Sequence, residues 1–455
     1  MPIPKGAVRA RTACVSFAAF GAFWGVWGAS VPAIRAQAEI GDGQLGTALL
    51  FVGAGALPTM LATGRAVDRW GYRVTAALLV VLGAVGVAVA ATARDFLSLS
   101  AGLALLGASS GAADVAINAA AGSAERAAGR PVVIRAHGFF SAGVVLGSLS
   151  TGLLAGLGTP VIVPFLLVAA LLVGAGLAVM ADGRAASALP GAGGWVVSTV
   201  PGTGGQAVST MPGADGRSAP AVPGVEGRAV LAGAERDAAR GPASRRAGVR
   251  LLPLLVIGGL GALAFGLENA HQSWGAVYLA DMLAAGPVLA AAGPAVFAAI
   301  VALTRFTAGS VGSRRATPLL VAGATTAGVG TLVVAVADAV PIALLGLALA
   351  AAGTAVLFPT LISLVTAHVD DAARGRATSI VTTVAYLGFL AGPVYVGRWA
   401  EATGLSGAMV AVAALAATLA ILAWPALRSV VRPGSSWDVI PDDLGLAEKA
   451  SSRDS

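Results

Sequence analysis

Residues 64–73, GRAVDRWGYR, are a charged stretch between two long apolar segments. Residues 43–64 before the charges and 74–93 after them carry no acid or base. Each segment is long enough to cross about 30 Å of hydrocarbon as a helix. The charged stretch therefore predicts a helical hairpin whose turn lies at a membrane face.

Each residue type in this turn has a physical role. Gly64 is expected to let helices approach closely, and Gly71 to permit a tight exit from the helix. Three arginines are expected to hold the loop in the cytoplasm, namely Arg65, Arg69 and Arg73. Asp68 is the one acid among them, so it can pair with an arginine or a helix N-terminus and latch one helix against another.

The pattern G-x-x-x-D-R-x-G-x-R resembles the signature loop between the second and third helices of the major facilitator superfamily (MFS). The resemblance implies an all-α polytopic membrane protein with twelve transmembrane helices in two pseudo-symmetric six-helix bundles. It also implies a conformational latch, made here of Gly64, Asp68, Arg69, Gly71 and Arg73.

The composition supports a polytopic membrane protein independently. Of 455 residues, 57% are hydrophobic and 11% charged, with a mean hydropathy of +0.84, values that a water-soluble domain of this size does not tolerate. The net charge of +7 lies in loops and tails, where bases orient a membrane chain, so nucleic acid is not an expected partner.

The sequence lacks the residue patterns of disulfides, metal and haem sites, phosphate-binding loops and catalytic sites. Cys14 is the single cysteine, and the three histidines are far apart in sequence, so no disulfide, metal or haem pattern is recognisable. Lys5 and Lys449 are the only lysines and neither lies in a phosphate-binding loop. Without a nucleophile–base constellation, the sequence predicts no enzyme, no cofactor and no metal.

Apolar runs predict twelve helices. They lie near residues 12–34, 45–64, 74–92, 97–120, 137–157, 160–181, 251–279, 287–309, 317–337, 341–366, 377–397 and 404–427. The first run is too long for a signal peptide. Thr159-Pro160 divides the fifth span from the sixth, because proline cannot continue the helix.

Charge placement predicts the topology. The short loops expected inside hold eleven arginines, Arg305 among them, whereas the outside loops hold only Arg35, Arg94 and Arg398. This bias predicts both termini in the cytoplasm and a multi-pass protein of the cytoplasmic membrane. The expected parts are a six-helix bundle in 1–181, a flexible Gly/Pro-rich linker in 182–249, a second bundle in 250–427 and a polar, disordered tail in 428–455.

An internal repeat appears when the halves are shifted by 245 residues. Gly64 and Asp68 fall on Gly309 and Ser313, and Glu125 falls on Asp370. The glycines at 143, 147 and 152 fall on those at 388, 392 and 397. Paired six-helix halves are what a transporter that rocks about a midplane site requires.

Asp114 lies inside the fourth apolar run, four residues before Asn118 and on the same helical face. An acid within the membrane costs roughly 2.5–3.5 kcal/mol on insertion scales, so it should face the bundle interior or water. Desolvation would favour its protonated form and hydration its ionised form, which is what proton coupling needs. The alternative is that Asp114 caps or pairs locally near the cytoplasmic end.

The segment from Gly111 to Asn118 resembles the fourth helix of the fucose/proton symporter group, which has a glutamate at the matching place. The resemblance implies a role for Asp114 in proton movement. A second acid of that group, in the first helix, has no counterpart, since Pro32 stands there.

A second polar segment interrupts the seventh run and could bind a polar solute. Its members are Glu268, Asn269, His271 and Gln272, and spacing puts Glu268, His271 and Gln272 on one face. Glu268 is expected in the outer third, where an interfacial role is the alternative. Trp24 and Trp27 of the first helix could stack on a sugar or another ring, although packing is the more frequent role of such residues.

The sequence thus favours a secondary active transporter that works by alternating access, with protons, a small-molecule substrate and the lipid bilayer as partners and a monomeric state. Proton-coupled symport of a sugar or metabolite is the leading hypothesis. Drug or natural-product efflux is the alternative, although Gly107 stands near the place of the antiporters' arginine and the fifth helix lacks proline. A non-transporting membrane sensor is a third interpretation.

Overall fold

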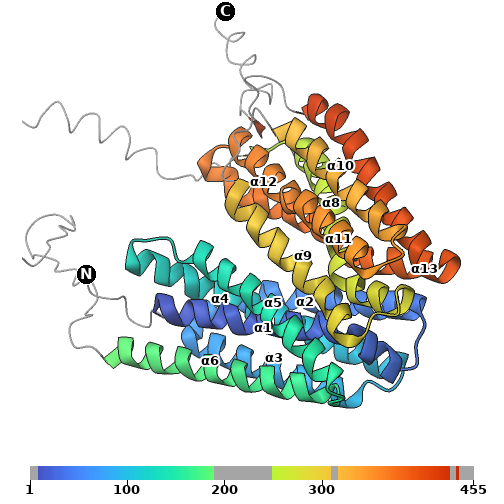
Figure 1. Ribbon diagram of the computed structural model, residues 1–455. Coiled ribbons are helices and arrows are strands. Elements are labelled where there is room, and N and C mark those ends of the chain that lie inside the picture. Colours follow the sequence, from blue (N-terminus) through green and yellow to red (C-terminus); the bar gives the residue numbers. More distant parts are fainter. Residues whose placement is uncertain (1–8, 189–247, 309–315, 431–436, 440–455) are drawn as a thin grey trace, which may run out of the picture.

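The computed structural model describes residues 9–188, 248–308, 316–430 and 437–439. The first half of the chain contains α1 (Ala10–Gln37), α2 (Asp42–Trp70), α3 (Tyr72–Thr92), α4 (Phe96–Ala128), α5 (Val133–Gly156) and α6 (Ile162–Ala188). The second half contains α8 (Leu251–Met282), α9 (Pro287–Ala308), α10 (Ala316–Ala335), α11 (Val340–Ala355), α12 (Leu357–His368) and α13 (Asp371–Val430). Figure 1 shows the two halves as separate helical bundles.

The number of membrane crossings agrees with the twelve predicted. Within the described ranges, eleven helical stretches are long and apolar enough to span a membrane, with α11 and α12 forming one of them. The last stretch, in α13, is 57 residues long. It is interrupted at Gly404, whose φ of 77° is not helical, so α13 supplies two crossings.

The charged stretch that predicted the hairpin is largely helical. Helix α2 continues to Trp70, so Gly64, Asp68 and Arg69 lie in its last turns and not in a loop. Gly71 alone separates α2 from α3, with a φ of 55° that favours glycine. The expected close helix approach at Gly64 is absent in this conformation, because a Cβ there would meet no described atom within 4 Å.

The predicted repeat corresponds to two equivalent helix crossings. In the first half, α5 crosses α1 at Gly143 and Gly147, where a Cβ on Gly147 would lie 3.0 Å from the Cα of Ala22. In the second half, a Cβ on Gly392 of α13 would lie 3.2 Å from the Cα of Gly266 in α8. Glycine at these positions lets the backbones approach closely.

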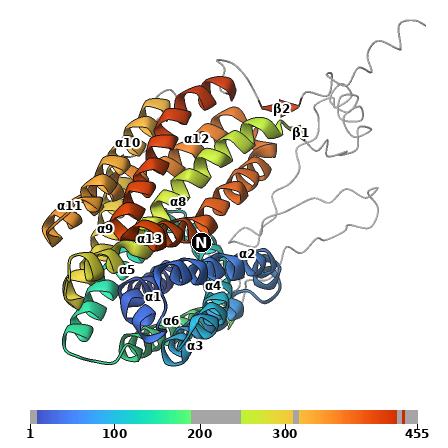
Figure 2. The same cartoon turned by 90° about the vertical axis from the view of Figure 1, so that its right-hand side faces the viewer.

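The halves meet mainly through two helix pairs, α2 with α13 and α5 with α9. We call the end of the molecule where α1 begins the amino end and the opposite end the far end. Gly46 of α2 packs on Gly397 of α13, and Gly152 of α5 packs on Val288 of α9, all close to the far end. The ribbons diverge toward the amino end (Figure 1), while α1, α2 and α13 adjoin in the orthogonal view (Figure 2).

The chain end contains an ordered contact where the sequence predicted disorder. Strand β1 (Gly248–Val249) pairs antiparallel with β2 (Asp438–Val439). Trp437 is 2% exposed, and its ring stacks on His368 at 4.8 Å. Its backbone N–H donates to the carbonyl of His368 at 2.9 Å. The contact of this tryptophan with His368 fixes residues 437–439. Most of the predicted linker, residues 189–247, lies outside the described residues.

Candidate functional site

Asp114 lies within α4 and not at its end. At a rise of about 1.5 Å per residue, Asp114 is about 27 Å from Phe96, where α4 begins at the far end of the molecule. It is about 21 Å from Ala128, where α4 ends at the amino end of the molecule. The Nδ2 of Asn118 donates to the Asp114 carboxylate at 3.0 Å and to its backbone carbonyl at 2.9 Å. The predicted shared face is therefore present, and a helix-capping role for Asp114 does not fit this position.

Asp114 faces the second half of the chain. It lies close enough to Tyr386 of α13 for the two groups to interact electrostatically. Tyr386 is about 27 Å from the break at Gly404, so it lies at the same level as Asp114. A carboxyl group of one half and a phenol of the other therefore lie at one level and within electrostatic range of each other.

Tyr386 belongs to an aromatic cluster on the second half. Its ring meets Phe265 of α8 edge-on at 5.6 Å, and Phe389 at 6.0 Å. Phe265 lies against Phe358 of α12 at 4.3 Å. All four rings are half-buried, which leaves apolar surface beside the polar groups of Asp114.

Glu268 lies near the middle of α8, about 21 Å from the far end of the helix, and not in the outer third as predicted. Nη2 of Arg305 donates to its two carboxylate oxygens at 3.3 and 3.4 Å. Gln272 adds a hydrogen bond from Nε2 at 3.1 Å. Arg305 was counted with an inside loop although the predicted span 287–309 contains it, and it lies in α9, which continues to Ala308.

Arg305 also lies within electrostatic range of the first half. It is near enough to His137 of α5 to interact with it electrostatically. Arg305 lies about 27 Å from the far end of α9. Arg305, Asp114 and Tyr386 are therefore at one level of the molecule.

Two predicted site residues are buried inside the second half. His271 is 1% exposed, with Nδ1 2.8 Å from the carbonyl of Leu267 and Nε2 2.9 Å from Thr331 Oγ1. Asn269 is buried and accepts a hydrogen bond from Ser273 at 2.8 Å. The predicted common face of Glu268, His271 and Gln272 is therefore wrong for His271, which packs against α10.

The two tryptophans of α1 differ. Trp27 is buried in the hydrophobic core. Trp24 is half-buried and meets Phe20 and Phe23 edge-on, at 6.5 and 6.0 Å. Of the two, Trp24 has surface left for a ligand.

The predicted latch residues lie at the carboxyl end of α2 and the start of α3, which is the amino end of the molecule. Among the residues that the structure describes, Asp68 forms no ion pair. The guanidinium of Arg69 lies 5.3 Å from the ring centre of Trp70. Gly309 and Ser313, the counterparts in the repeat, lie outside the described residues. The latch stays a prediction.

Comparison with known proteins gives whole-length matches. No family model matches the chain. An uncharacterized transporter of Sinorhizobium fredii is 28% identical over 402 residues, which cover 88% of this chain and 92% of the relative. An uncharacterized MFS-type transporter of Yersinia pestis is 25% identical over 410 residues, covering 88% and 90%.

Solved structures decide the fold. The nucleoside transporter NupG superposes with a TM-score of 0.64 at 13% identity, over 91% of this chain and 98% of NupG. The chain has the major facilitator fold. The chain is a multi-pass membrane protein. One relative is named a transporter and the other an MFS-type transporter, names that agree with the expectation of a non-enzyme.

Sequence reasoning missed the residues of the second half that complete this site. They are Phe265, Arg305, Phe358, Tyr386 and Phe389. Arg305 left a signal, because it interrupts the predicted span 287–309. The aromatic residues gave no sequence signal, because single aromatic residues are common in apolar helices.

Proposed function

We propose that the chain is a secondary active transporter that couples a small solute to protons through Asp114. The position of Asp114 carries the proposal, because this membrane-embedded acid lies mid-helix in one half, within electrostatic range of Tyr386 in the other. When the halves move, water gains or loses access to this carboxyl group. Hydration favours its ionised form and enclosure its neutral form, so proton binding follows the conformation.

The arginine bias predicts that the amino end faces the cytoplasm. Contacts near the far end, such as Gly46 with Gly397, close the outer side. The described conformation then corresponds to an inward-facing state. Alternating access requires a second state in which the far-end contacts open and the amino ends approach.

The leading substrate class is a sugar or another ring-bearing metabolite, moved together with a proton. The likeness of Gly111–Asn118 to the fucose/proton symporter group supports symport. The half-buried rings of the second half offer faces for stacking. Asn118 and the Glu268–Arg305 pair supply donors and acceptors for hydroxyl groups.

The test is transport in proteoliposomes with a pH-sensitive dye, screening sugars and ring-bearing metabolites. Asp114→Asn is expected to abolish solute-dependent proton movement while solute still exchanges across the membrane. Asp95→Asn is the matched control, because Asp95 caps α4 at the far end. Equal proton movement in the wild type and in Asp114→Asn would falsify the assignment.

Efflux of an organic cation in exchange for protons is the second candidate. It is favoured by a carboxyl group that faces an aromatic cluster, since both attract cations. The dye distinguishes the two functions: symport moves protons in the direction of the solute, and antiport moves them against it. Competition by a quaternary amine, with no effect of sugars, supports antiport.

A further inference from the structure

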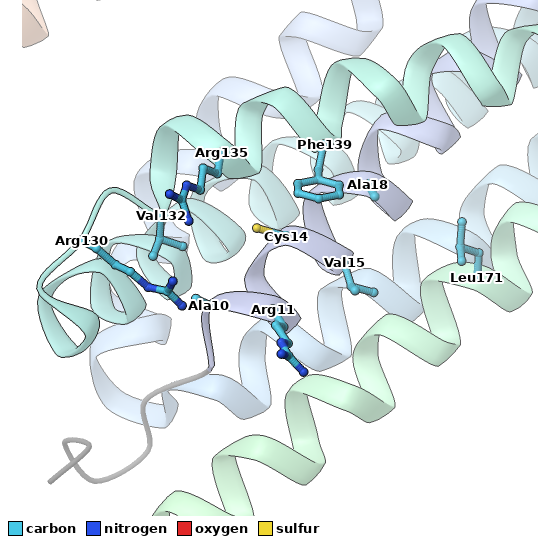
Figure 3. A pocket seen from close by; sticks show the side chains of 10 residues that line it. All are labelled: Ala10, Arg11, Cys14, Val15, Ala18, Arg130, Val132, Arg135, Phe139 and Leu171. Atoms are coloured by element: carbon cyan, nitrogen blue, oxygen red, sulfur yellow. The ribbon is translucent and has the colours of Figure 1, made fainter. Parts of the chain in front are cut away.

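A pocket of about 470 Å³ lies in the first half, between α1, the connection from α4 to α5, α5 and α6. Arg130 and Arg135 lie on one side of it and Arg11 on α1, while Val15, Phe139 and Leu171 continue its wall along the helices (Figure 3). The pocket is thus basic at one end and apolar at the other.

The three arginines are free to bind an anion. All are exposed, and within the described part of the chain none forms an ion pair. Two nearby acids are engaged elsewhere. Glu125 accepts hydrogen bonds from the backbone of Val132 and Val133 at 2.8 and 3.0 Å, and Asp182 binds Arg9 and Thr12.

The apolar wall is at membrane depth. Val15, Phe139 and Leu171 are 46%, 52% and 47% exposed, which in a bilayer means contact with acyl chains. Leu171 lies about 17 Å along α6 from Asp182, which binds Thr12 next to Arg11. The pocket therefore runs from the headgroup level toward the middle of the membrane.

The pocket is separate from the Asp114 site. Helix α6 packs on α1, α3 and α5 of its own half, and it lies on the side of that half turned away from the second half (Figure 1). An occupant of this pocket meets the bilayer and not the solute pathway.

We propose that this pocket binds a phospholipid with an anionic headgroup. Guanidinium groups bind phosphate through charge-assisted hydrogen bonds, and basic pockets between transmembrane helices suit anionic lipid headgroups. The phosphate lies among Arg11, Arg130 and Arg135, and one acyl chain follows Val15 and Phe139 toward Leu171. This assignment does not depend on the proposed transport function.

The test is native mass spectrometry of the full-length protein in detergent, titrated with long-chain phosphatidylglycerol or phosphatidylcholine. The wild type is expected to bind phosphatidylglycerol more tightly. The variant with Arg11, Arg130 and Arg135 all changed to Gln is expected to bind it on the order of 100-fold more weakly, from the usual contribution of each basic residue at a membrane surface. Arg376→Gln removes an exposed arginine from the second half and is expected to bind like the wild type.

Further arms separate the lipid from other anions. Thermal stabilisation by phosphatidylglycerol is expected, and inorganic phosphate at equal concentration is expected to give none. Equal protection by inorganic phosphate, or unchanged lipid binding by the triple variant, overturns the proposal. If the triple variant does not fold, Arg130→Gln replaces it, because Arg130 lies between helices. This variant is expected to bind phosphatidylglycerol about fivefold more weakly than the wild type.

Discussion

At the scale of single residues, the hydroxyl of Tyr386 is expected to assist Asp114. Tyr386→Phe keeps the edge-on contact with Phe265 at 5.6 Å, so stability should stay the same. Loss of this hydroxyl, which lies within electrostatic range of Asp114, is expected to slow proton-coupled transport about tenfold. Initial rates of solute-driven proton movement measure this, with thermal unfolding as the control. Full activity of Tyr386→Phe would assign the residue to packing alone.

The sequence predicted part of the site at this scale. Four-residue spacing was sufficient to put Asn118 beside Asp114, because neighbours on one helical face are a local property. His271 and Gln272 are adjacent in sequence yet point about 100° apart around the helix, and which of them enters the core depends on where α10 lies. The meeting of Asp114 with Tyr386 requires both halves in place, so no local pattern contained it.

At the scale of helices, the crossing of α5 over α1 depends on Gly147. Gly147→Val would put side-chain atoms against the backbone of Ala22, and overpacking of this kind costs about 1–3 kcal/mol. Thermal unfolding in detergent is expected to shift to lower temperature. Gly174→Val on α6 is the matched control, since a Cβ there meets no described atom within 4 Å. Equal melting temperatures for the two variants would contradict this account of the crossing.

Helix positions were predictable and helix ends were not. Apolar length located every crossing, because spans must satisfy their backbone within the membrane. Charged residues, however, continue the helices beyond the hydrocarbon. Arg69 lies in α2, which continues to Trp70 beyond the predicted end at residue 64, so the loop drawn from charge alone was too long there. The ring of Trp437 stacks on His368. The average polarity of the tail did not reveal this contact, because it depends on a single large side chain.

At the scale of the whole molecule, the arrangement of the halves follows from small residues at the far end and from one charged bridge. The pairs α2–α13 and α5–α9 are closely packed there through Gly46, Gly152 and Gly397. The repeat in the sequence predicted two like bundles, but not which ends would touch. That choice depends on contacts between residues over 200 positions apart, and it changes as the transporter works.

The bridge is formed by Arg35 of α1, which pairs with Asp42 of its own half and, at 2.6 Å, with Asp281 of the other. Because these side chains are partly exposed, the pair between the halves should stabilise this conformation by only about 1 kcal/mol. Asp281→Asn is therefore expected to raise the population open at the far end roughly fivefold.

Spin labels at the far ends of α6 and α10 measure that population as a change in their distance distribution. The control is Arg398→Gln, whose partner Glu401 lies on the same helix at 2.9 Å, so its loss removes a charge at this end without cutting a bridge between halves. Arg35→Gln should reproduce the effect of Asp281→Asn. The double variant should differ little from either single variant, because both changes break the same Arg35–Asp281 ion pair. Additive effects would mean that the two residues act independently and that closure of the far end rests on helix packing.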